Sequence, residues 1–398
     1  MTDLKDFQKQ EERCLFPTYN RYPLAICKGQ GYFLYDATGK KYYDFLSGIA
    51  VCILGHNHPQ ISKTICEQAQ KLLHVSNLFF QEEQLELAQK LLRFAPQNKV
   101  FFCNSGAEAN EGAIKLVRRY FREAKKENRF EIITFSNSFH GRTLATLTAT
   151  GQDKIKQGFE PLVPGFKILP FNNSDVLRQS IGQETAAIML EVIQGEGGIV
   201  PVNSDFVQTI KHLCAKHDLL LIVDEIQTGM GRTGEFFAHT HYGLDPDIIT
   251  LAKGLGNGLP IGAVMAKEKL AQAMAPGSHG STFGGNPLAC KVASKVLEIL
   301  EQDRLLERAQ TRGAYLKKEL LGLQENFPEL IAEVRGQGLM LGVELKQDPK
   351  RVWTKLLEQG FITNLTQDKV LRLLPPLILD EDAVQKFTHT LKNILSKL

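Results

Sequence analysis

The residues best suited to chemistry lie between positions 219 and 263. Asp224 and Glu225 end the apolar run 219–223, which has the length and composition of a buried strand. In open α/β sheets, ligands bind at the carboxyl ends of the strands. Lys253 follows a second apolar run and precedes a glycine-rich segment. Partial desolvation there lowers a lysine's pKa and makes its amine nucleophilic. The pattern therefore predicts a reactive amine close to a buried carboxylate.

A second candidate is an anion site at the start of a helix. Apolar residues 100–102 run into small residues and then into a helical pattern, with Ser105 placed as the N-cap. Backbone N–H groups at such a helix start bind phosphate. An ordinary capped helix without a ligand has the same pattern, so these residues alone do not decide between the two.

Two other patterns are weaker. The run 229–234 matches the glycine pattern of dinucleotide-binding loops, but poor helix-opening sequence follows it, so we do not expect a nicotinamide site there. The histidine pairs at 56/58 and 239/241 lack a carboxylate or cysteine at metal-site spacing, so we interpret them as loop histidines and expect no metal.

The elements that must position these residues follow an α/β pattern. Helical patterns alternate with short apolar strands, which predicts a mostly parallel sheet covered on both faces. The expected helices are 61–73, 84–94 and 107–124, and the expected strands are 99–102, 131–135, 187–190 and 219–223.

The remaining segments predict a smaller α+β lobe built from both chain ends. One long amphipathic helix is expected over 288–323, followed by strands near 339–344 and 370–373 and a closing helix. We therefore predict an N-terminal segment of the small domain (1–55), a large domain (56–285) and a C-terminal part of the small domain (286–398).

Composition excludes several classes of protein. The 398 residues carry 47 Lys and Arg against 44 Asp and Glu, a net charge of +3 that gives no electrostatic footprint for nucleic acid. The N-terminus is charged and lacks the apolar core of a secretion signal, and no apolar run is long enough to span a membrane. Seven cysteines without a C-x-x-C pair suit a reducing compartment, so a cytoplasmic protein is expected.

The segment 219–263 resembles the signature of the class III aminotransferases, and the likeness extends from 48–51 through 55–59 to the last strand. The resemblance implies a pyridoxal-phosphate-dependent transferase of fold type I. Its large domain would hold a mostly parallel seven-stranded sheet, with a smaller α+β domain beside it.

The resemblance also assigns roles around pyridoxal 5'-phosphate. Lys253 would form the Schiff base and shuttle the proton, and Asp224 would keep the ring nitrogen protonated. Gln227 would bind the ring hydroxyl and Phe139 would stack on the ring. The rest of the implied cofactor-binding set is Ser105, Gly106 and Ala107 at the phosphate, with Glu225, Ile226 and Thr282. Thr282 would reach across from the neighbouring subunit, so a homodimer is expected.

Transamination requires one pocket to accept two substrates in turn. Arg142 matches the family position that binds the carboxylate common to both, and Ser281 belongs to the substrate-binding set. Glutamate carries a further carboxylate on its reacting carbon, for which Arg372 matches a second arginine. Glu196 matches the residue that covers this arginine when no carboxylate is present, because an unpaired buried charge is costly.

Within the family, the sequence most resembles members that move the δ-amino group of acetylornithine to 2-oxoglutarate in arginine biosynthesis. Members acting on succinylornithine, succinyldiaminopimelate, ornithine or 4-aminobutyrate share most of these motifs. Phenylalanines stand at 79 and 80 where a tyrosine is expected, which leaves the acyl preference open. An aminomutase or racemase, a nicotinamide oxidoreductase and a non-catalytic binding protein are the alternatives from other classes.

Overall fold

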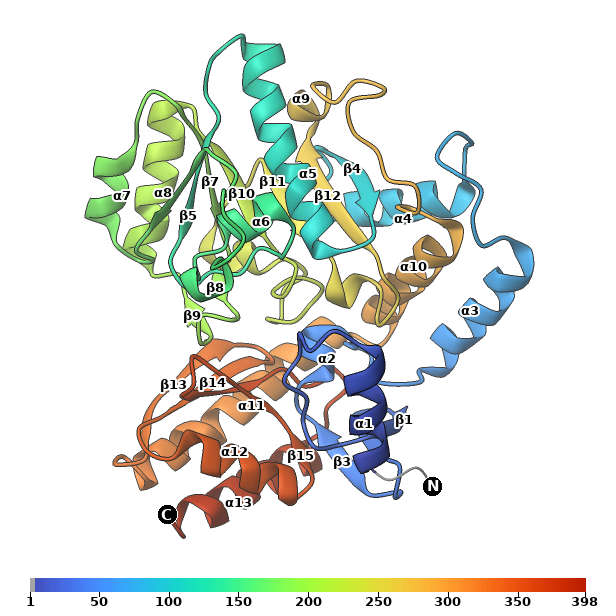
Figure 1. Ribbon diagram of the computed structural model, residues 1–398, viewed down its shortest axis with the longest axis vertical. Coiled ribbons are helices and arrows are strands. Elements are labelled where there is room, and N and C mark those ends of the chain that lie inside the picture. The colour runs from blue at the N-terminus through green and yellow to red at the C-terminus, as the bar shows by residue number, and fades with distance from the viewer. Residues whose placement is uncertain (1–3) are drawn as a thin grey trace.

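The computed structural model describes residues 4–398, which form two lobes (Figure 1). The upper lobe contains a seven-stranded sheet in the order β4-β12-β11-β10-β7-β5-β6. Only β12 runs antiparallel to its neighbours β4 and β11, so the prediction of a mostly parallel sheet is confirmed. The strands are β4 (Asn98–Cys103), β5 (Glu131–Phe135), β6 (Phe166–Leu169), β7 (Thr185–Leu190), β10 (Leu220–Asp224), β11 (Ile248–Leu251) and β12 (Gly262–Lys267).

Helices cover both faces of this sheet, which is why its central strands are almost entirely apolar. Successive residues of β10 face opposite sides, so Ile222 packs in the core cluster that includes α5 and Val223 packs in the cluster that includes α8. The helices of this lobe are α3 (Pro59–Lys71), α4 (Glu82–Leu92), α5 (Gly106–Arg119), α6 (Leu144–Ala149), α7 (Ser174–Ser180), α8 (Ser204–His217) and α9 (Glu268–Ala271).

Several short elements complete the upper lobe. A π-helical turn (Tyr120–Lys125) extends α5, and the strands β8 (Ile193–Gln194) and β9 (Val200–Pro201) form a small hairpin. Short 3-10 turns cover Asp153–Ile155, Ala238–Tyr242 and Lys253–Leu255.

The lower lobe joins the two ends of the chain. Strand β3 (Lys41–Asp44) pairs in parallel with β15 (Phe361–Ile362), so N-terminal and C-terminal segments share one sheet, and both termini lie in this lobe (Figure 1). Its other strands are β1 (Ile26–Gln30), β2 (Phe33–Asp36), β13 (Ile331–Gln337), β14 (Met340–Leu345), β16 (Asn364–Thr366) and β17 (Val370–Leu373). Its helices are α1 (Leu4–Cys14), α2 (Ser47–Ala50), α12 (Pro349–Glu358) and α13 (Glu381–Leu395). The domain boundaries after residues 55 and 285 stay a prediction.

The prediction of a single long helix over 288–323 is wrong. The chain forms α10 (Pro287–Gln302) and α11 (Leu305–Asn326), separated at Arg304, whose φ of 51° is left-handed. The two helices have different partners, because α10 packs against α3 and α4 whereas α11 packs against β13 and α13. Each helix has its own amphipathic face, so the periodic spacing of apolar residues continues across the break and conceals it in the sequence.

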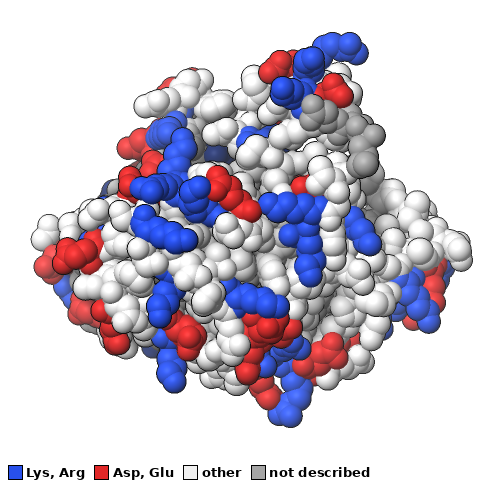
Figure 2. All heavy atoms as spheres, turned by 90° about the horizontal axis from the view of Figure 1, so that it is seen from below, with Lys and Arg blue, Asp and Glu red and all other residues white. Residues whose placement is uncertain are grey.

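The face of the molecule seen from below is mixed in charge. In the view from below, Lys and Arg side chains alternate with Asp and Glu (Figure 2). None of the helices within residues 4–398 combines the length and apolar character needed to cross a membrane.

Candidate active site

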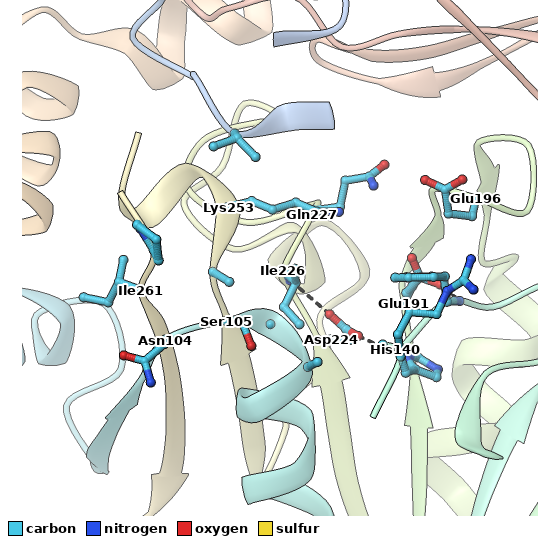
Figure 3. Close-up of a pocket in the computed structure, with 18 of the residues that line it drawn as sticks. Asn104, Ser105, His140, Glu191, Glu196, Asp224, Ile226, Gln227, Lys253 and Ile261 are labelled. Atoms are coloured by element: carbon cyan, nitrogen blue, oxygen red, sulfur yellow. Dashed lines mark hydrogen bonds and ion pairs between the residues drawn. The ribbon is translucent and has the colours of Figure 1, made fainter. Parts of the chain in front are cut away.

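A cavity of about 370 Å³ opens at the carboxyl ends of the central strands (Figure 3). Loops from separate parts of the chain line it, and they bring together most of the residues predicted from the sequence. These are Ser105, Gly106, Ala107, Phe139, Arg142, Glu196, Asp224, Ile226, Gln227 and Lys253.

Asp224 is the last residue of β10 and is held in a network of buried hydrogen bonds. Its Oδ2 accepts from Asn110 Nδ2 at 2.8 Å and lies 2.9 Å from His140 Nδ1, and its Oδ1 accepts the N–H of Ile226 at 3.0 Å. Asn110 is itself oriented by the hydroxyl of Thr250, which donates to its Oδ1 at 2.8 Å. The carboxylate is therefore fixed in direction before any ligand binds.

Asn110 and His140 were missed in the sequence analysis. Asn110 lies on α5, and His140 stands between two residues that were named, Phe139 and Arg142. A polar residue on the buried face of a helix and a histidine inside a recognised motif were the available signals.

Lys253 begins the turn that follows β11. Its φ of 40° lies in the left-handed region, a strained conformation for a lysine of the kind that concentrates at functional sites. Burial lowers the pKa of its amine. The carboxylates of Glu196, Glu191 and Asp224 oppose that shift, and the guanidinium of Arg372 adds to it. The amine is thus biased toward its neutral, nucleophilic form.

The start of α5 opens into the same cavity. Ser105 caps the helix, and its hydroxyl accepts the N–H of Glu108 at 3.2 Å. A Cβ on Gly106 would lie 2.8 Å from Cδ1 of Ile226, so any larger residue at the helix start would have to displace the side chain of Ile226. The first backbone N–H groups of α5 and its positive dipole end suit a phosphate.

Gln227 lines the cavity, but Glu225 does not. The Oε1 of Gln227 is buried and has no hydrogen-bond partner among residues 4–398. The carboxylate of Glu225 faces away, because its Oε1 accepts the N–H of His239 at 2.8 Å and its Oε2 the hydroxyl of Thr228 at 2.5 Å. Adjacent residues leaving a strand point to opposite sides, so the neighbouring Asp224 reaches the cavity and Glu225 supports the loop behind it.

Of the two predicted arginines, only Arg142 lines the cavity, whereas Arg372 is connected to it through its ion pair with Glu196 of the cavity wall. Arg372 on β17 has a side chain that is only 1% exposed, and its Nη1 donates to Glu196 Oε1 at 2.5 Å. Its Nε donates to Asn364 Oδ1 at 3.1 Å. Arg142 is exposed at the cavity wall, with its guanidinium 5.7 Å from the centre of the Phe139 ring. Arg372 is therefore covered by a carboxylate, whereas Arg142 is open to the cavity.

Glu191 is an additional buried carboxyl in the wall that sequence reasoning did not single out. Its Oε2 accepts the N–H of Phe139 at 2.9 Å, and its Oε1 accepts that of Gly195 at 3.2 Å. Burial raises the pKa of Glu191 to about 7, with His140 opposing the shift and Asp224 adding to it. Nothing in the local sequence distinguishes Glu191 from Glu196.

Ser281 and Thr282 do not reach this cavity. They line a separate hollow with Phe101, Glu108 and His279. Asn104 borders both spaces, and its Nδ2 donates to Ser281 Oγ at 3.1 Å. Within one chain, these two residues are therefore set apart from the other predicted site residues.

The run 229–234 forms turns after β10 and does not open a helix. The guanidinium of Arg232 is fully buried there, and its Nη1 donates to the carbonyl of Leu339 at 3.0 Å and to that of Pro375. This segment connects the two lobes.

The cavity residues suit a particular class of ligand. A lysine of lowered pKa can react with an aldehyde, and a fixed buried carboxylate can hold a protonated ring nitrogen. The start of α5 can bind a phosphate, and Phe139 can cover a flat ring. The unpartnered oxygen of Gln227 leaves one buried polar atom for a ring substituent. A phosphorylated aromatic aldehyde meets each of these requirements.

Comparison with known proteins agrees with this chemistry. The family described as Aminotransferase class-III matches residues 16–395. The acetylornithine aminotransferase of Aquifex aeolicus is 49% identical over 96% of this chain and 99% of its own length. The crystal structure of the Toxoplasma gondii ornithine aminotransferase superposes with a TM-score of 0.95 at 32% identity, covering 100% of this chain and 96% of that one. The acetylornithine aminotransferase structure from Elizabethkingia anophelis has a TM-score of 0.89 at 36% identity and covers both chains completely.

Proposed function

The chain belongs to the class III aminotransferases, a pyridoxal-phosphate-dependent family, and on that premise we propose its substrates. We propose that it moves the δ-amino group of N2-acetyl-L-ornithine to 2-oxoglutarate, giving N-acetyl-L-glutamate 5-semialdehyde and L-glutamate, in arginine biosynthesis. The observation that carries this proposal is the combination of Arg142, which is open to the cavity, with a buried Arg372, which is paired with Glu196 of the cavity wall. An enzyme that alternates between substrates with one and two carboxylates near the reaction centre needs such a pair.

The residues of the cavity fit pyridoxal 5'-phosphate. Ser105, Gly106 and Ala107 would hold the phosphate, Asp224 the ring nitrogen and Gln227 the ring hydroxyl. When bound, the cofactor supplies an electron-withdrawing ring that stabilises negative charge on the substrate carbon that loses a proton. The bonds from Asn110 and His140 keep Asp224 directed at the cavity, so the chain provides a fixed negative charge there.

Lys253 is the residue that moves the proton. Its Nζ has a lowered pKa and lies in the cavity, so it can take a proton from the substrate carbon and return it. The carboxylates of Glu191 and Glu196 favour the protonated form. Burial nevertheless lowers the pKa of Lys253, which favours the neutral amine that can accept the proton.

The two arginines divide the substrate carboxylates between them. Arg142 would bind the carboxylate of acetylornithine and the distal carboxylate of glutamate as a bidentate partner. Only glutamate carries a carboxylate at the reacting carbon, and this group would displace Glu196 from Arg372. With acetylornithine bound, Glu196 would stay in place and keep the buried guanidinium paired.

We also propose that the active enzyme is a homodimer in which Thr282 contacts the cofactor of the neighbouring subunit. Asn77 Nδ2 donates to the carbonyls of Ser281 and Gly284, which ties the loop at 76–80 to the segment that contains Thr282. Apolar side chains of these two segments are strongly exposed, and contiguous exposed apolar surface indicates an interface. They are Leu78, Phe79, Phe80 and Phe283.

The test is a panel of amine donors mixed with the purified enzyme while the visible absorbance of the bound cofactor is followed. The panel is acetylornithine, succinylornithine, ornithine, succinyldiaminopimelate and 4-aminobutyrate. Acetylornithine should remove the band with the highest kcat/KM, and added 2-oxoglutarate should restore it. A faster reaction with any other member would reassign the substrate, and turnover without a keto acid would indicate an aminomutase or racemase.

A further inference from the structure

Glu196, the side chain that covers Arg372, stands at the tip of a buried hairpin. Strands β8 and β9 pair through Ile193 with Pro201 and Gln194 with Val200, which leaves residues 195–199 as the loop. Every residue of this loop is buried except Glu196, whose side chain is 31% exposed. Mobile gating loops are usually exposed and poorly hydrogen-bonded. This loop has neither property.

The two glycines that follow Glu196 are closely packed and do not provide a free hinge. A Cβ on Gly197 would lie 2.7 Å from Gln194 Oε1 and 3.0 Å from the carbonyl oxygen of Asn137. Gly198 has a φ of +101°, and a Cβ there would lie 3.2 Å from Arg335 Nη2. The backbone of the loop therefore has little room to move.

Side chains from three directions bind the loop backbone. Glu191 accepts the N–H of Gly195 at 3.2 Å. Gln367 Nε2 donates to the carbonyl of Glu196 at 2.9 Å, and Arg335 Nε donates to the carbonyl of Gly198 at 2.9 Å.

The last two side chains come from the sheet that also carries Arg372. Arg335 lies on β13, Gln367 lies between β16 and β17, and Arg372 lies on β17. Arg335 is oriented by ion pairs to Glu344 at 2.6 Å and Glu333 at 2.7 Å. The covering residue and the cation that it covers are thus both positioned against one rigid element.

We infer that Arg335 and Gln367 are positioning residues for the exchange of substrates. They hold the hairpin tip in place, so that only the side chain of Glu196 rotates away when a carboxylate reaches Arg372. The expected effect on substrate specificity rests on the proposed function. If the loop is held less firmly, Glu196 covers Arg372 less well. The acetylornithine half-reaction is then disfavoured, because the buried guanidinium lacks its partner. The glutamate half-reaction is favoured, because Glu196 competes less with the glutamate carboxylate for Arg372.

The decisive variant is Gln367→Ala, because this side chain is exposed and its loss leaves the core intact. Losing one hydrogen bond should raise the ratio of kcat/KM for glutamate to that for acetylornithine about fivefold in single-turnover measurements. Gln347→Ala is the matched control, since Gln347 also donates to a carbonyl, that of Glu329, in the same lobe. Arg335→Lys keeps a positive charge beside Glu344 but loses the planar Nε donor, and should move the ratio in the same direction.

A second measurement does not depend on turnover. Amide hydrogen exchange of the peptide covering 191–202, without substrates, should be faster in Gln367→Ala than in the wild type and unchanged in Gln347→Ala. Unchanged exchange, or a half-reaction ratio within twofold of the wild type in both Gln367→Ala and Arg335→Lys, overturns the inference. If the wild type converts neither substrate, the proposed function fails, and the exchange experiment still decides whether these residues hold the loop.

Discussion

Replacing Arg372 by Leu should separate the two half-reactions. The Arg372 side chain is 1% exposed, so its guanidinium acts in a site largely closed to water. Truncating one member of a buried, hydrogen-bonded charge pair costs about 2–5 kcal/mol. We therefore expect kcat/KM for glutamate to fall by about 30- to 5,000-fold.

The acetylornithine half-reaction should respond much less to the same change. In that half-reaction the partner of Arg372 is Glu196, whose side chain is 31% exposed and can be solvated once the arginine is gone. A partly exposed ion pair contributes about 1 kcal/mol or less, so the loss should be about fivefold at most. Arg372 also lowers the pKa of Lys253, after the larger effect of burial. Removing it should therefore raise that pKa in both half-reactions alike.

The assay is stopped-flow absorbance of the bound cofactor in single turnovers, with each substrate alone and across a range of pH. Asn364→Ala is a graded control, because it removes only the neutral acceptor of Arg372 Nε and should cost about fivefold with glutamate. Equal losses in the two half-reactions of Arg372→Leu, with an unchanged Tm, would refute the assignment of Arg372 to the second carboxylate.

Three further changes test the remaining parts of the site. Lys253→Ala should abolish the visible absorbance of the bound cofactor and lower turnover by more than about 10²-fold, and a retained band would place the reactive amine elsewhere. The raised pKa of Glu191, about 7 against an ordinary 4.5, means that the folded chain holds this proton more tightly than the unfolded chain. Its stabilising contribution is complete below pH 4.5 and is lost as pH rises through about 7. The side chain of Glu191→Gln stays neutral, so the Tm of this variant relative to that of the wild type should rise between about pH 5 and about pH 8. A Tm difference that does not change with pH would contradict this. Thr282→Ala should weaken cofactor retention about fivefold while light scattering still reports a dimer, and unchanged retention would remove Thr282 from the partner's site.

Local pattern was sufficient for the elements that present the site. The runs that became β4, β5, β7 and β10 were predicted within two residues of their ends, because strands covered on both faces, as β5, β7 and β10 are, consist mostly of apolar residues. Ser105 was identified as a helix cap for a similarly local reason, and its hydroxyl does accept the N–H of Glu108. Asp224 and Lys253 followed from their places after two such strands.

Contacts between distant segments could not be predicted in this way. Asn110, His140 and Asp224 meet only because α5, the loop after β5 and the end of β10 converge. The break at Arg304 was hidden because the helices on either side both have an amphipathic pattern. The spacing of apolar residues indicates which residues must be buried, but it does not indicate which other element packs against them.

The sequence by itself determined the fold class, since that depends on local patterns of apolar residues, and its resemblance to the class III aminotransferases supplied the expected roles of the site residues. Tertiary structure decided direction and proximity. It turned Glu225 away from the cavity beside an inward Asp224, and it placed Ser281 and Thr282 in a separate hollow. It also set Gln367 against the carbonyl of Glu196. These outcomes depend on how separate elements pack against each other, and no local run of residues records that packing.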